Sequence, residues 1–280
     1  MLLQSQLDTL NGNRWLGSDV INYFLSYWAR YGVNFISTYY CFLFLNKNKE
    51  IEDNFDLRAA WKLYDKRSVS KQVFANDQFF KAPLFIPLHY RTNHYTLMFL
   101  NFQKREFVYL DPFSVKTGNI IKTKILMKNT LQLIKKIISK KSEVTYELKL
   151  QDWKICNEKY THLPDQKDSY NCGVYVIYYA RRIIEIVKGL PSGFDVMDTD
   201  SEICEKLRPI LFEKVLELSD SIHDRCIFCW SSNESNNIVY VECGRCRNWI
   251  HVSCLPKPCK ERYNKTKKSE AFLCGLCFKK

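Results

Sequence analysis

The chain has 280 residues, 46% of them apolar, and 42 Lys/Arg against 30 Asp/Glu give a formal net charge of +12. This composition supports one full domain with an appendage, or two modest domains, and argues against disorder over most of the length. Residues 1–16 are too polar for a secretory signal, and the longest apolar run, residues 39–45, is too short for a membrane span. The positive charge fits an anionic or nuclear environment. Of the partners considered, nucleic acid has the least support, because a net positive charge often serves only solubility.

The twelve cysteines are spaced for metal binding rather than for disulfides. Eight of them lie between Cys226 and Cys277; seven of these form pairs separated by two residues, with His251 completing one pair, and Cys259 falls outside the pattern. Clustered pairs of this kind indicate zinc in a reducing compartment, which favours a nuclear or nucleocytoplasmic location. The four cysteines scattered singly through the rest of the chain are Cys41, Cys156, Cys172 and Cys204.

Helical and strand patterns follow one another through the first hundred residues. Ser18 or Asp19 is placed to cap a helix whose apolar residues recur at helical spacing, and a second helix is expected at residues 56–64. Residues 34–45 are β-branched and aromatic, which fits either a strand or a buried helix. Three strands are then predicted, at residues 84–88, 94–102 and 106–110.

The last two strands are expected to form a hairpin that turns at residues 103–105. In an antiparallel hairpin centred near residue 103, His94 and Asp111 lie opposite each other. A carboxylate bound to one imidazole nitrogen fixes the tautomer and supports the other nitrogen as a base. A purely structural His–Asp pair is the alternative. His89 is the rival histidine, but it lies inside the preceding strand without a carboxylate at a matching offset.

The segment after the hairpin leads to a cysteine at a predicted helix start. A basic amphipathic helix is expected at residues 117–141, a strand at 144–150 and a later helix at 201–221. Between them, a polar run ends at Cys172 and an apolar segment continues to Gly189. The partial positive charge of a helix N-terminus favours thiolate over thiol. The alternative is that Cys172 is a small buried core residue.

Four residues together provide what a cysteine protease needs: His94, Asp111, Gln166 and Cys172. The thiolate attacks a carbonyl, the histidine transfers the proton and the aspartate orients the histidine. The Gln166 amide and the Cys172 backbone N–H can stabilise the oxyanion.

The sequences around these residues resemble the ubiquitin-like-protein protease family, which comprises the SUMO- and NEDD8-specific proteases and, more distantly, adenain-like viral proteases. The resemblance covers roughly residues 10–215, and its first motif matches Trp15-Leu16, Asp19 and Ile21. The matching sequences are His94-Tyr95, Tyr109-Leu110-Asp111-Pro112 and the Gln-x-Asp-x-x-Asn-Cys-Gly-Val pattern of residues 166–174.

This resemblance implies an α+β fold, a papain-like cysteine protease domain in which the helix bearing the nucleophile packs on a mixed sheet. In SUMO proteases two aromatic residues, at the positions of Trp15 and Tyr95 here, flatten a tunnel that admits only a Gly-Gly tail. This chain has Tyr95 where tryptophan is usual, and Asp111-Pro112-Phe113 is nearer the viral and transposon-encoded pattern. The expected substrate is a SUMO-like modifier or its conjugate. Processing of a viral- or transposon-type polyprotein is the alternative.

A composition break near residue 222 separates a predicted protease domain, 1–222, from a zinc-stabilised domain, 223–280. The second holds eight ligands, which two tetrahedral zinc sites require. Because the histidine is fifth and Trp249 precedes it by two residues, the segment resembles a PHD finger more than the RING of a ubiquitin ligase. The implied cross-brace places Cys226, Cys229, His251 and Cys254 on one Zn²⁺, and Cys243, Cys246, Cys274 and Cys277 on the other.

Many PHD fingers bind histone tails, and some hold methyl-lysine in an aromatic cage. Tyr240 and Trp249 stand where cage residues occur, although packing alone accounts for a tryptophan at that position. Zinc for folding alone, or docking of another protein, is the alternative role. The sequence therefore predicts a cysteine protease directed by a finger that binds protein or a histone tail. A chromatin reader with an inactive protease scaffold is the rival hypothesis.

Overall fold

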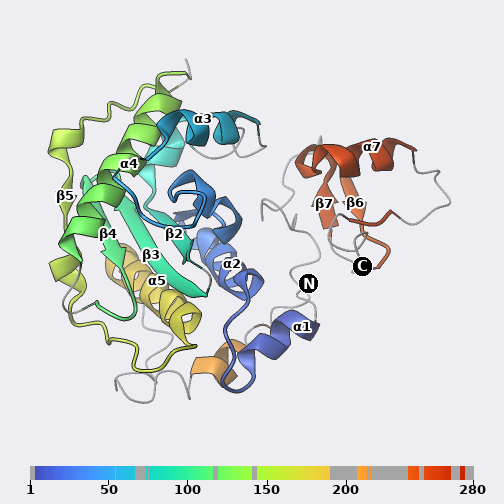
Figure 1. Ribbon diagram of the computed structural model, residues 1–280, viewed down its shortest axis with the longest axis horizontal. Helices are drawn as coiled ribbons and strands as arrows, with labels where there is room; N and C mark the ends of the chain where they lie inside the picture. Colours follow the sequence, from blue (N-terminus) through green and yellow to red (C-terminus); the bar gives the residue numbers. More distant parts are fainter. Residues whose placement is uncertain are drawn as a thin grey trace. The chain divides into compact units, whose positions relative to one another are not determined.

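The computed structural model describes residues 4–53, 55–66, 74, 76–91, 93–115, 119–140, 144–189, 207–212, 215, 239–245, 249–265 and 272–274. The chain divides into two compact units. The larger comprises Gln6–Ile210, and the smaller contains the described residues from Leu211 onward (Figure 1).

A five-stranded mixed sheet forms the centre of the larger unit, in the order β1-β2-β3-β4-β5. The three central strands are antiparallel, and each edge strand is parallel to its neighbour. Nearly every residue of the central strands is buried, as expected when helices cover both faces of a sheet. The strands are β1 (Asn34–Phe35), β2 (Leu84–Tyr90), β3 (His94–Asn101), β4 (Glu106–Leu110) and β5 (Lys154–Ile155).

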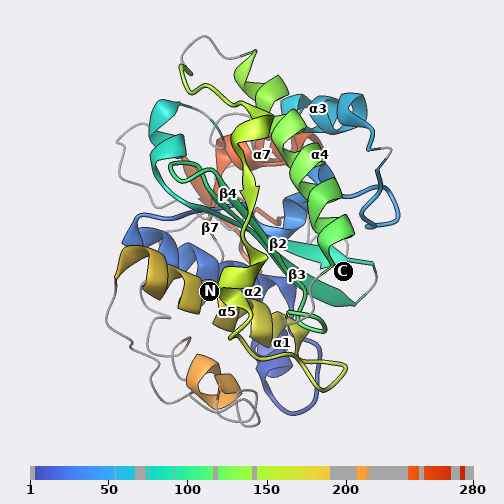
Figure 2. The same cartoon turned by 90° about the vertical axis from the view of Figure 1, so that its left-hand side faces the viewer.

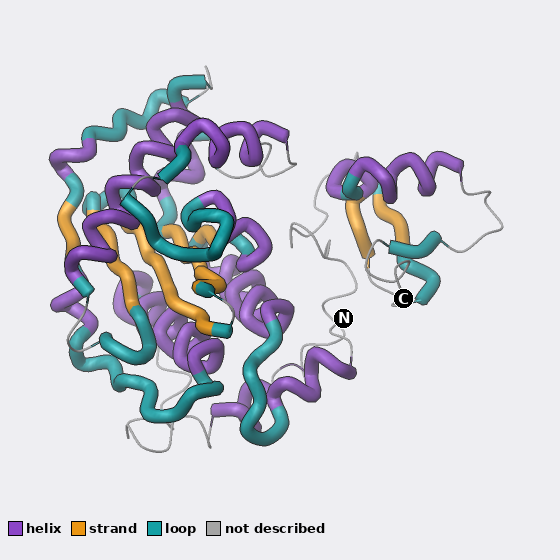
Figure 3. Tube along the Cα trace, in the orientation of Figure 1, coloured by secondary structure: helices purple, strands orange, loops and turns teal. Residues whose placement is uncertain are grey.

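Helices cover both faces of this sheet (Figures 2 and 3). On one face, apolar residues of α3 and α4 share a buried cluster with alternate residues of β2, β3 and β4. On the other face, α5 packs on β3 and against α2. The helices of this unit are α1 (Gln4–Leu7, at its margin), α2 (Ser18–Trp28), α3 (Leu57–Lys66), α4 (Ile120–Ile138) and α5 (Cys172–Lys188).

The predicted helices and hairpin strands are confirmed within a few residues at their ends. The N-cap of α2 is Gly17, so Ser18 and Asp19 both lie in the first turn and neither caps the helix. Residues 34–45 contain both a short strand, β1, and a 3₁₀ helix, Thr38–Leu43. Of the helix predicted at 201–221, residues 207–212 and 215 are helical, and the rest lies outside the described residues.

The strand predicted at residues 144–150 is wrong. Residues 144–149 form no regular element, and the parallel edge strand is β5, ten residues further along. The backbone N–H groups of Thr145 and Tyr146 donate to the carboxylate of Asp77 at 2.8 and 3.0 Å. A side chain therefore satisfies the donors that a neighbouring strand would otherwise bind.

The hairpin register also differs from the prediction. The ladder pairs Asn101 with Glu106 and ends at Leu97 opposite Leu110. One further pair would place Asp111 opposite Thr96, so His94 reaches Asp111 diagonally rather than directly across the strands. Diagonal neighbours in a sheet remain within reach of long side chains.

Gly173, in the first turn of α5, allows close packing against the segment that leads into α2. An added Cβ there would lie 2.9 Å from Leu16 Cβ and 3.1 Å from Ile21 Cδ1. We therefore expect Gly173→Ala to lower the free energy of unfolding by about 1–3 kcal/mol, measured by urea denaturation. Gly17→Ala is the steric control, because its Cβ would meet only ordinary contacts at 3.5 Å or more, and alanine at this N-cap position should cost less than about 1 kcal/mol. Equal stability of the two variants would contradict the packing argument.

The smaller unit contains the antiparallel hairpin β6 (Tyr240–Glu242) and β7 (Trp249–His251), followed by α7 (Lys257–Lys265). Its buried cluster includes cysteines together with Ile250, Leu255 and Phe272. Across the described residues of both units, no helix combines the length and apolar character needed to cross a membrane.

Candidate active site

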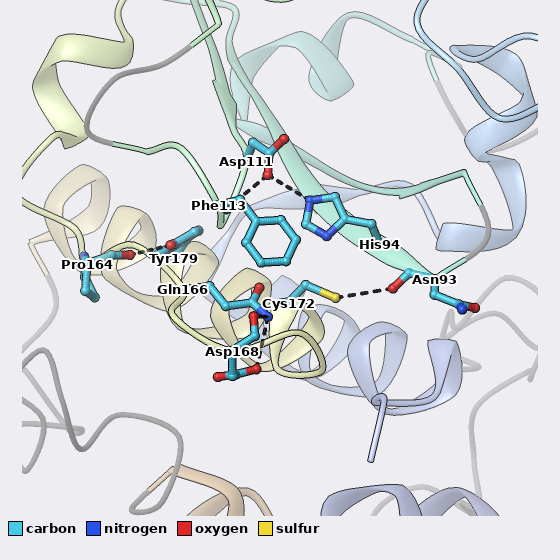
Figure 4. Close-up of polar contacts among 9 residues, drawn as sticks. All are labelled: Asn93, His94, Asp111, Phe113, Pro164, Gln166, Asp168, Cys172 and Tyr179. Carbon is cyan, nitrogen blue, oxygen red and sulfur yellow. Dashed lines mark hydrogen bonds and ion pairs between the residues drawn. The ribbon is translucent and has the colours of Figure 1, made fainter. Parts of the chain in front are cut away.

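His94, the first residue of β3, is hydrogen-bonded to Asp111, which follows the last residue of β4 (Figure 4). Its Nε2 lies 2.7 Å from Asp111 Oδ1. Burial alone would lower the pKa of His94, but hydrogen bonds with Asp111 and Cys172 outweigh it and raise the pKa to about 9. Burial alone would raise the pKa of Asp111. The hydrogen bond from His94 and its charge outweigh burial and keep the pKa of Asp111 below its ordinary value. The pair therefore favours an imidazolium next to a carboxylate.

Cys172 is the first residue of α5 and lies on the other side of His94 from Asp111. The nearness of its side chain to the imidazole is one cause of the raised His94 pKa. Its sulfur also lies 3.7 Å from the carbonyl oxygen of Asn93, the residue before His94. Since α5 packs on β3, the helix holds the sulfur beside the strand that carries the histidine. The residue is 2% exposed, so the rest of the site covers the sulfur almost completely.

Phe113 is a site residue that the sequence analysis did not identify. Its ring stacks on the His94 imidazole, with centroids 4.8 Å apart, and its backbone N–H donates to Asp111 Oδ1 at 3.1 Å. Phe113 is 52% exposed, although it packs on the half-buried His94–Asp111 pair. A ring face on an imidazolium is a favourable cation–π arrangement. The sequence feature that could have identified Phe113 is its position two residues after Asp111.

Gln166 lies beside Cys172, but its amide donors bind elsewhere (Figure 4). The Nε2 group donates to the backbone oxygen and the carboxylate of Asp168, at 2.8 and 3.1 Å. The Oε1 atom is buried and has no hydrogen-bond partner among the described residues. The side chain is therefore close enough to serve the site, while its donors hold the loop.

Asp168 organises the loop that precedes the nucleophile. Its carboxylate accepts hydrogen bonds from the backbone N–H groups of Tyr170 and Asn171 and from the Asn171 amide. Burial opposes ionisation, but these bonds lower the pKa of Asp168 below its ordinary value. A charged Asp168 therefore fixes the loop conformation immediately before Cys172.

The two aromatic residues predicted to line a tunnel have different environments. Trp15 is 53% exposed, and its indole N–H donates to the Ser169 carbonyl at 3.0 Å, which places it on the nucleophile loop. Tyr95 is buried, stacks on His89 at 4.7 Å and shares a 2.6 Å hydrogen bond with Ser18. Only Trp15 therefore offers a broad exposed face beside the loop.

Four of the eight predicted zinc ligands are described: Cys243, His251, Cys254 and Cys274; Cys226, Cys229, Cys246 and Cys277 lie outside the described residues. Cys254 Sγ lies 3.6 Å from His251 Nδ1, and the Cys274 N–H donates to Cys243 Sγ at 3.3 Å. A sulfur and a nitrogen on one tetrahedral zinc are about 3.5 Å apart, given bond lengths of roughly 2.3 and 2.0 Å. Cys254 and His251 therefore lie as far apart as two ligands of one zinc, while the Cys243–Cys274 contact joins a sulfur to a backbone N–H, and the described residues contain no group of three or more donors.

Tyr240 and Trp249 lie near each other on the β6–β7 hairpin. Their ring centroids are 6.3 Å apart and the rings are nearly perpendicular, at 75°. The Tyr240 ring also packs at 4.4 Å against His251, one of the predicted ligands. Two perpendicular rings can form adjacent walls of a cage, and the contact with His251 is equally suited to packing around the metal.

Comparison with solved structures finds Ulp1-type proteases and bacterial effectors. The SUMO protease Ulp1 with a sulfenic-acid catalytic cysteine is 17% identical, with a TM-score of 0.49 over 79% of this chain and 84% of that one. A Ulp1-like SUMO protease domain from Chaetomium thermophilum is 15% identical, with a TM-score of 0.49 over 75% and 77%. The Chlamydia trachomatis effector Cdu1, solved bound to ubiquitin, is 12% identical, with a TM-score of 0.42 over 75% and 96%.

No curated protein sequence matches the chain. Family profiles do match, and together they span most of its length. The catalytic domain of the Ulp1 protease family matches residues 14–221, and the JHD1 PHD-type zinc finger matches residues 225–273. The chain therefore belongs to the Ulp1 protease family and is a cysteine peptidase with a zinc-binding PHD-type finger.

Proposed function

We propose that this peptidase cleaves the peptide or isopeptide bond after the Gly-Gly tail of a SUMO-like modifier, with Cys172 as nucleophile. The observation that carries the proposal is the placement of His94 between Asp111, to which it is hydrogen-bonded at 2.7 Å, and Cys172, which begins α5 and helps to raise the pKa of His94. A protonated His94 between a sulfur and a carboxylate is the arrangement that prepares a thiolate for attack on a carbonyl.

In this mechanism, Cys172 Sγ attacks the carbonyl carbon of the terminal glycine and forms a tetrahedral oxyanion. The carbon–nitrogen bond then breaks, and the leaving amine takes the proton that His94 carried. Water attacks the resulting thioester while His94 accepts one of its protons. The modifier leaves as a free carboxylic acid and the thiolate–imidazolium pair is restored. Asp111 keeps the imidazole oriented throughout.

Gln166 is the proposed side-chain donor to the oxyanion, together with the backbone N–H of Cys172. Both Asp168 contacts of its amide are present before substrate binds, and the bond to the carboxylate, at 3.1 Å, is the longer. We propose that the N–H of this longer bond turns to the oxyanion while the other keeps Gln166 on the loop. A donor aimed at developing charge contributes more in the transition state than in the ground state.

Trp15 is the proposed wall of the passage for the tail. Its exposed ring is tied to Ser169, three residues before the nucleophile. A flat aromatic face close to a buried sulfur leaves room for a tail without side chains more readily than for a tail with branched side chains. Tyr95 holds Ser18, in the first turn of α2, from within the core. The exposed Phe113 ring adds an apolar surface next to the histidine.

The finger is the proposed targeting element. We place the protease at residues 1–222 and the finger at 223–280, with two structural Zn²⁺ ions held by the eight ligands of the cross-brace. The near-perpendicular Tyr240 and Trp249 rings support binding of a protein segment such as a histone tail. A nuclear or nucleocytoplasmic location follows from that role.

The test is labelling with a panel of ubiquitin-like modifiers that carry a thiol-reactive C-terminal warhead. We expect a SUMO-type modifier to form a covalent adduct with the wild-type chain and with Cys41→Ala, but not with Cys172→Ala. If iodoacetamide marks Cys172 selectively while no modifier does, the site is an active peptidase and the polyprotein alternative replaces the modifier. If Cys172 reacts no faster than Cys41, the nucleophile assignment is wrong.

A further inference from the structure

Arg208 joins three segments of the larger unit that are far apart in the sequence. The residue lies in the helical stretch 207–212 and is 7% exposed. Each guanidinium nitrogen donates one short hydrogen bond: Nε to Asn171 Oδ1 at 2.7 Å, Nη1 to the Thr9 carbonyl at 2.7 Å and Nη2 to the Arg14 carbonyl at 2.6 Å. The guanidinium carbon also lies 5.9 Å from the centre of the Tyr170 ring.

Two of these acceptors belong to residues that immediately precede site residues. Arg14 precedes Trp15, the exposed aromatic of the proposed tail passage, and Asn171 precedes the nucleophile, Cys172. The Trp15 indole makes a second, direct link between the N-terminal segment and the nucleophile loop, because its N–H donates to the Ser169 carbonyl. The N-terminal segment and the nucleophile loop are therefore joined both through Arg208 and directly.

The orientation of the Asn171 amide is fixed by a charge at each end. Its Nδ2 donates to the Asp168 carboxylate at 3.0 Å, and its Oδ1 accepts from Arg208. Asn171 is also the N-cap residue of α5. The carboxylate, the amide and the guanidinium thus form a continuous hydrogen-bonded series, buried at Asn171 and Arg208, that ends beside the first turn of the nucleophile helix.

We propose that Arg208 is a positioning residue that holds the Trp15 segment at a fixed distance from Cys172 and so sets the width of the tail passage. The inference rests on the proposed function, because it assumes that the tail passes between these two residues. A buried guanidinium is costly unless it is hydrogen-bonded. A planar fork is suited to three acceptors distributed over two segments, whereas the ammonium of lysine is a compact point charge.

The experiment compares Arg208→Met and Arg208→Lys with the matched pair Arg181→Met and Arg181→Lys. Arg181 is also buried, but its ion pair with Glu185, at 3.3 Å, lies within α5. Steady-state cleavage of a modifier-tail amide reports kcat and KM. The rate of alkylation by iodoacetamide reports the reactivity of Cys172 independently of tail binding, because the reagent is small. Hydrogen–deuterium exchange reports the mobility of residues 9–16 and 163–172.

Both Arg208 variants should lower kcat/KM at least about tenfold, chiefly through KM, since a displacement near 1 Å in a site is worth up to about 10²-fold. Their iodoacetamide rates should stay within about threefold of wild type, because a small reagent makes no use of the passage. Exchange should rise in both segments. The Arg181 variants should lose stability without these changes.

Three results would overturn the proposal: wild-type kcat/KM in Arg208→Lys, losses no larger than those of the Arg181 variants, or unchanged exchange in both segments. Failure of the proposed function would give a different result: modifier cleavage would survive in Cys172→Ala or be absent in the wild type. In that case the hydrogen-exchange comparison would still show whether Arg208 holds the two segments together. If Arg208→Met does not fold, Asn171→Ala removes one arm and should produce smaller changes in the same direction.

Discussion

Replacing Asp111 with asparagine should lower kcat/KM for a modifier-tail substrate by about 10²–10⁴-fold while leaving the protein folded. Asparagine keeps the size of the carboxylate and can still contact His94, but it removes the negative charge that supports the imidazolium. The 2.7 Å bond between His94 and Asp111 is the strongest geometric constraint on the imidazole. Its loss leaves the histidine free to adopt the wrong tautomer or orientation.

The same substitution should change the pH dependence of the reaction. The pKa of His94 is raised to about 9, from an ordinary value near 6.5, so the imidazolium persists through neutral pH. It contributes stability that is complete below pH 6.5 and is lost as the pH rises through about 9. Activity that depends on this proton should therefore fall on the alkaline side near pH 9. In Asp111→Asn, burial is no longer opposed by the carboxylate, and the alkaline limb should move to lower pH.

The control is Asp152→Asn, which removes a carboxylate paired with Arg105 on the surface of the same unit. It should leave both the rate and the alkaline limb unchanged. A pH–rate profile of kcat/KM from pH 5 to about 10 makes the measurement, because that ratio reports groups of the free enzyme. If kcat/KM of Asp111→Asn falls at the same alkaline pH as that of the wild type, a group other than His94 causes the fall.

The elements that the sequence predicted well are those with apolar residues at helical spacing or in a long unbroken run. Helices α2, α4 and α5 follow the 3.6-residue pattern, and β2 to β4 follow long apolar runs. The register of the β3–β4 hairpin was wrong because no pattern within the two strands specifies which residues of a longer turn remain unpaired. Residues 144–150 alternate like a strand, but Asp77 binds their N–H groups, and a contact 68 residues away in the chain leaves no local signal.

The catalytic residues were predictable because chemistry restricts them to a few residue types in a recognisable order. The residues that position them were not. Arg208 lies 37 residues from Asn171 and 199 from Thr9, so its three bonds exist only after the chain has folded. The stacking of Phe113 on His94 depends on the backbone after β4, and the Gln166–Asp168 contact depends on the loop conformation. Side-chain identity indicated what Gln166 can donate, but not where the donors point in the free protein.

Removing zinc should unfold the smaller unit and leave catalysis in the larger unit intact. A segment of this size has too small an apolar cluster to fold without metal, and zinc binding supplies about 10–16 kcal/mol in comparable fingers. We expect about two Zn²⁺ ions per chain by elemental analysis, since eight ligands fill two tetrahedral sites. A strong chelator should abolish protection of β6 and β7 from hydrogen exchange, while cleavage of a small tail substrate continues.

Single substitutions separate ligands from the other cysteines of the finger. Cys243→Ser should reduce the zinc content and loosen β6, because the Cys243 sulfur accepts the Cys274 N–H and belongs to the buried cluster. Cys259→Ser should keep the full zinc content, since that sulfur accepts a hydrogen bond from Arg262 and lies outside the ligand spacing. Because zinc binds thiolates, acidification should release the metal from the wild-type finger. The opposite outcome for the two variants would place Cys259 in the metal site and require a different pairing of the ligands.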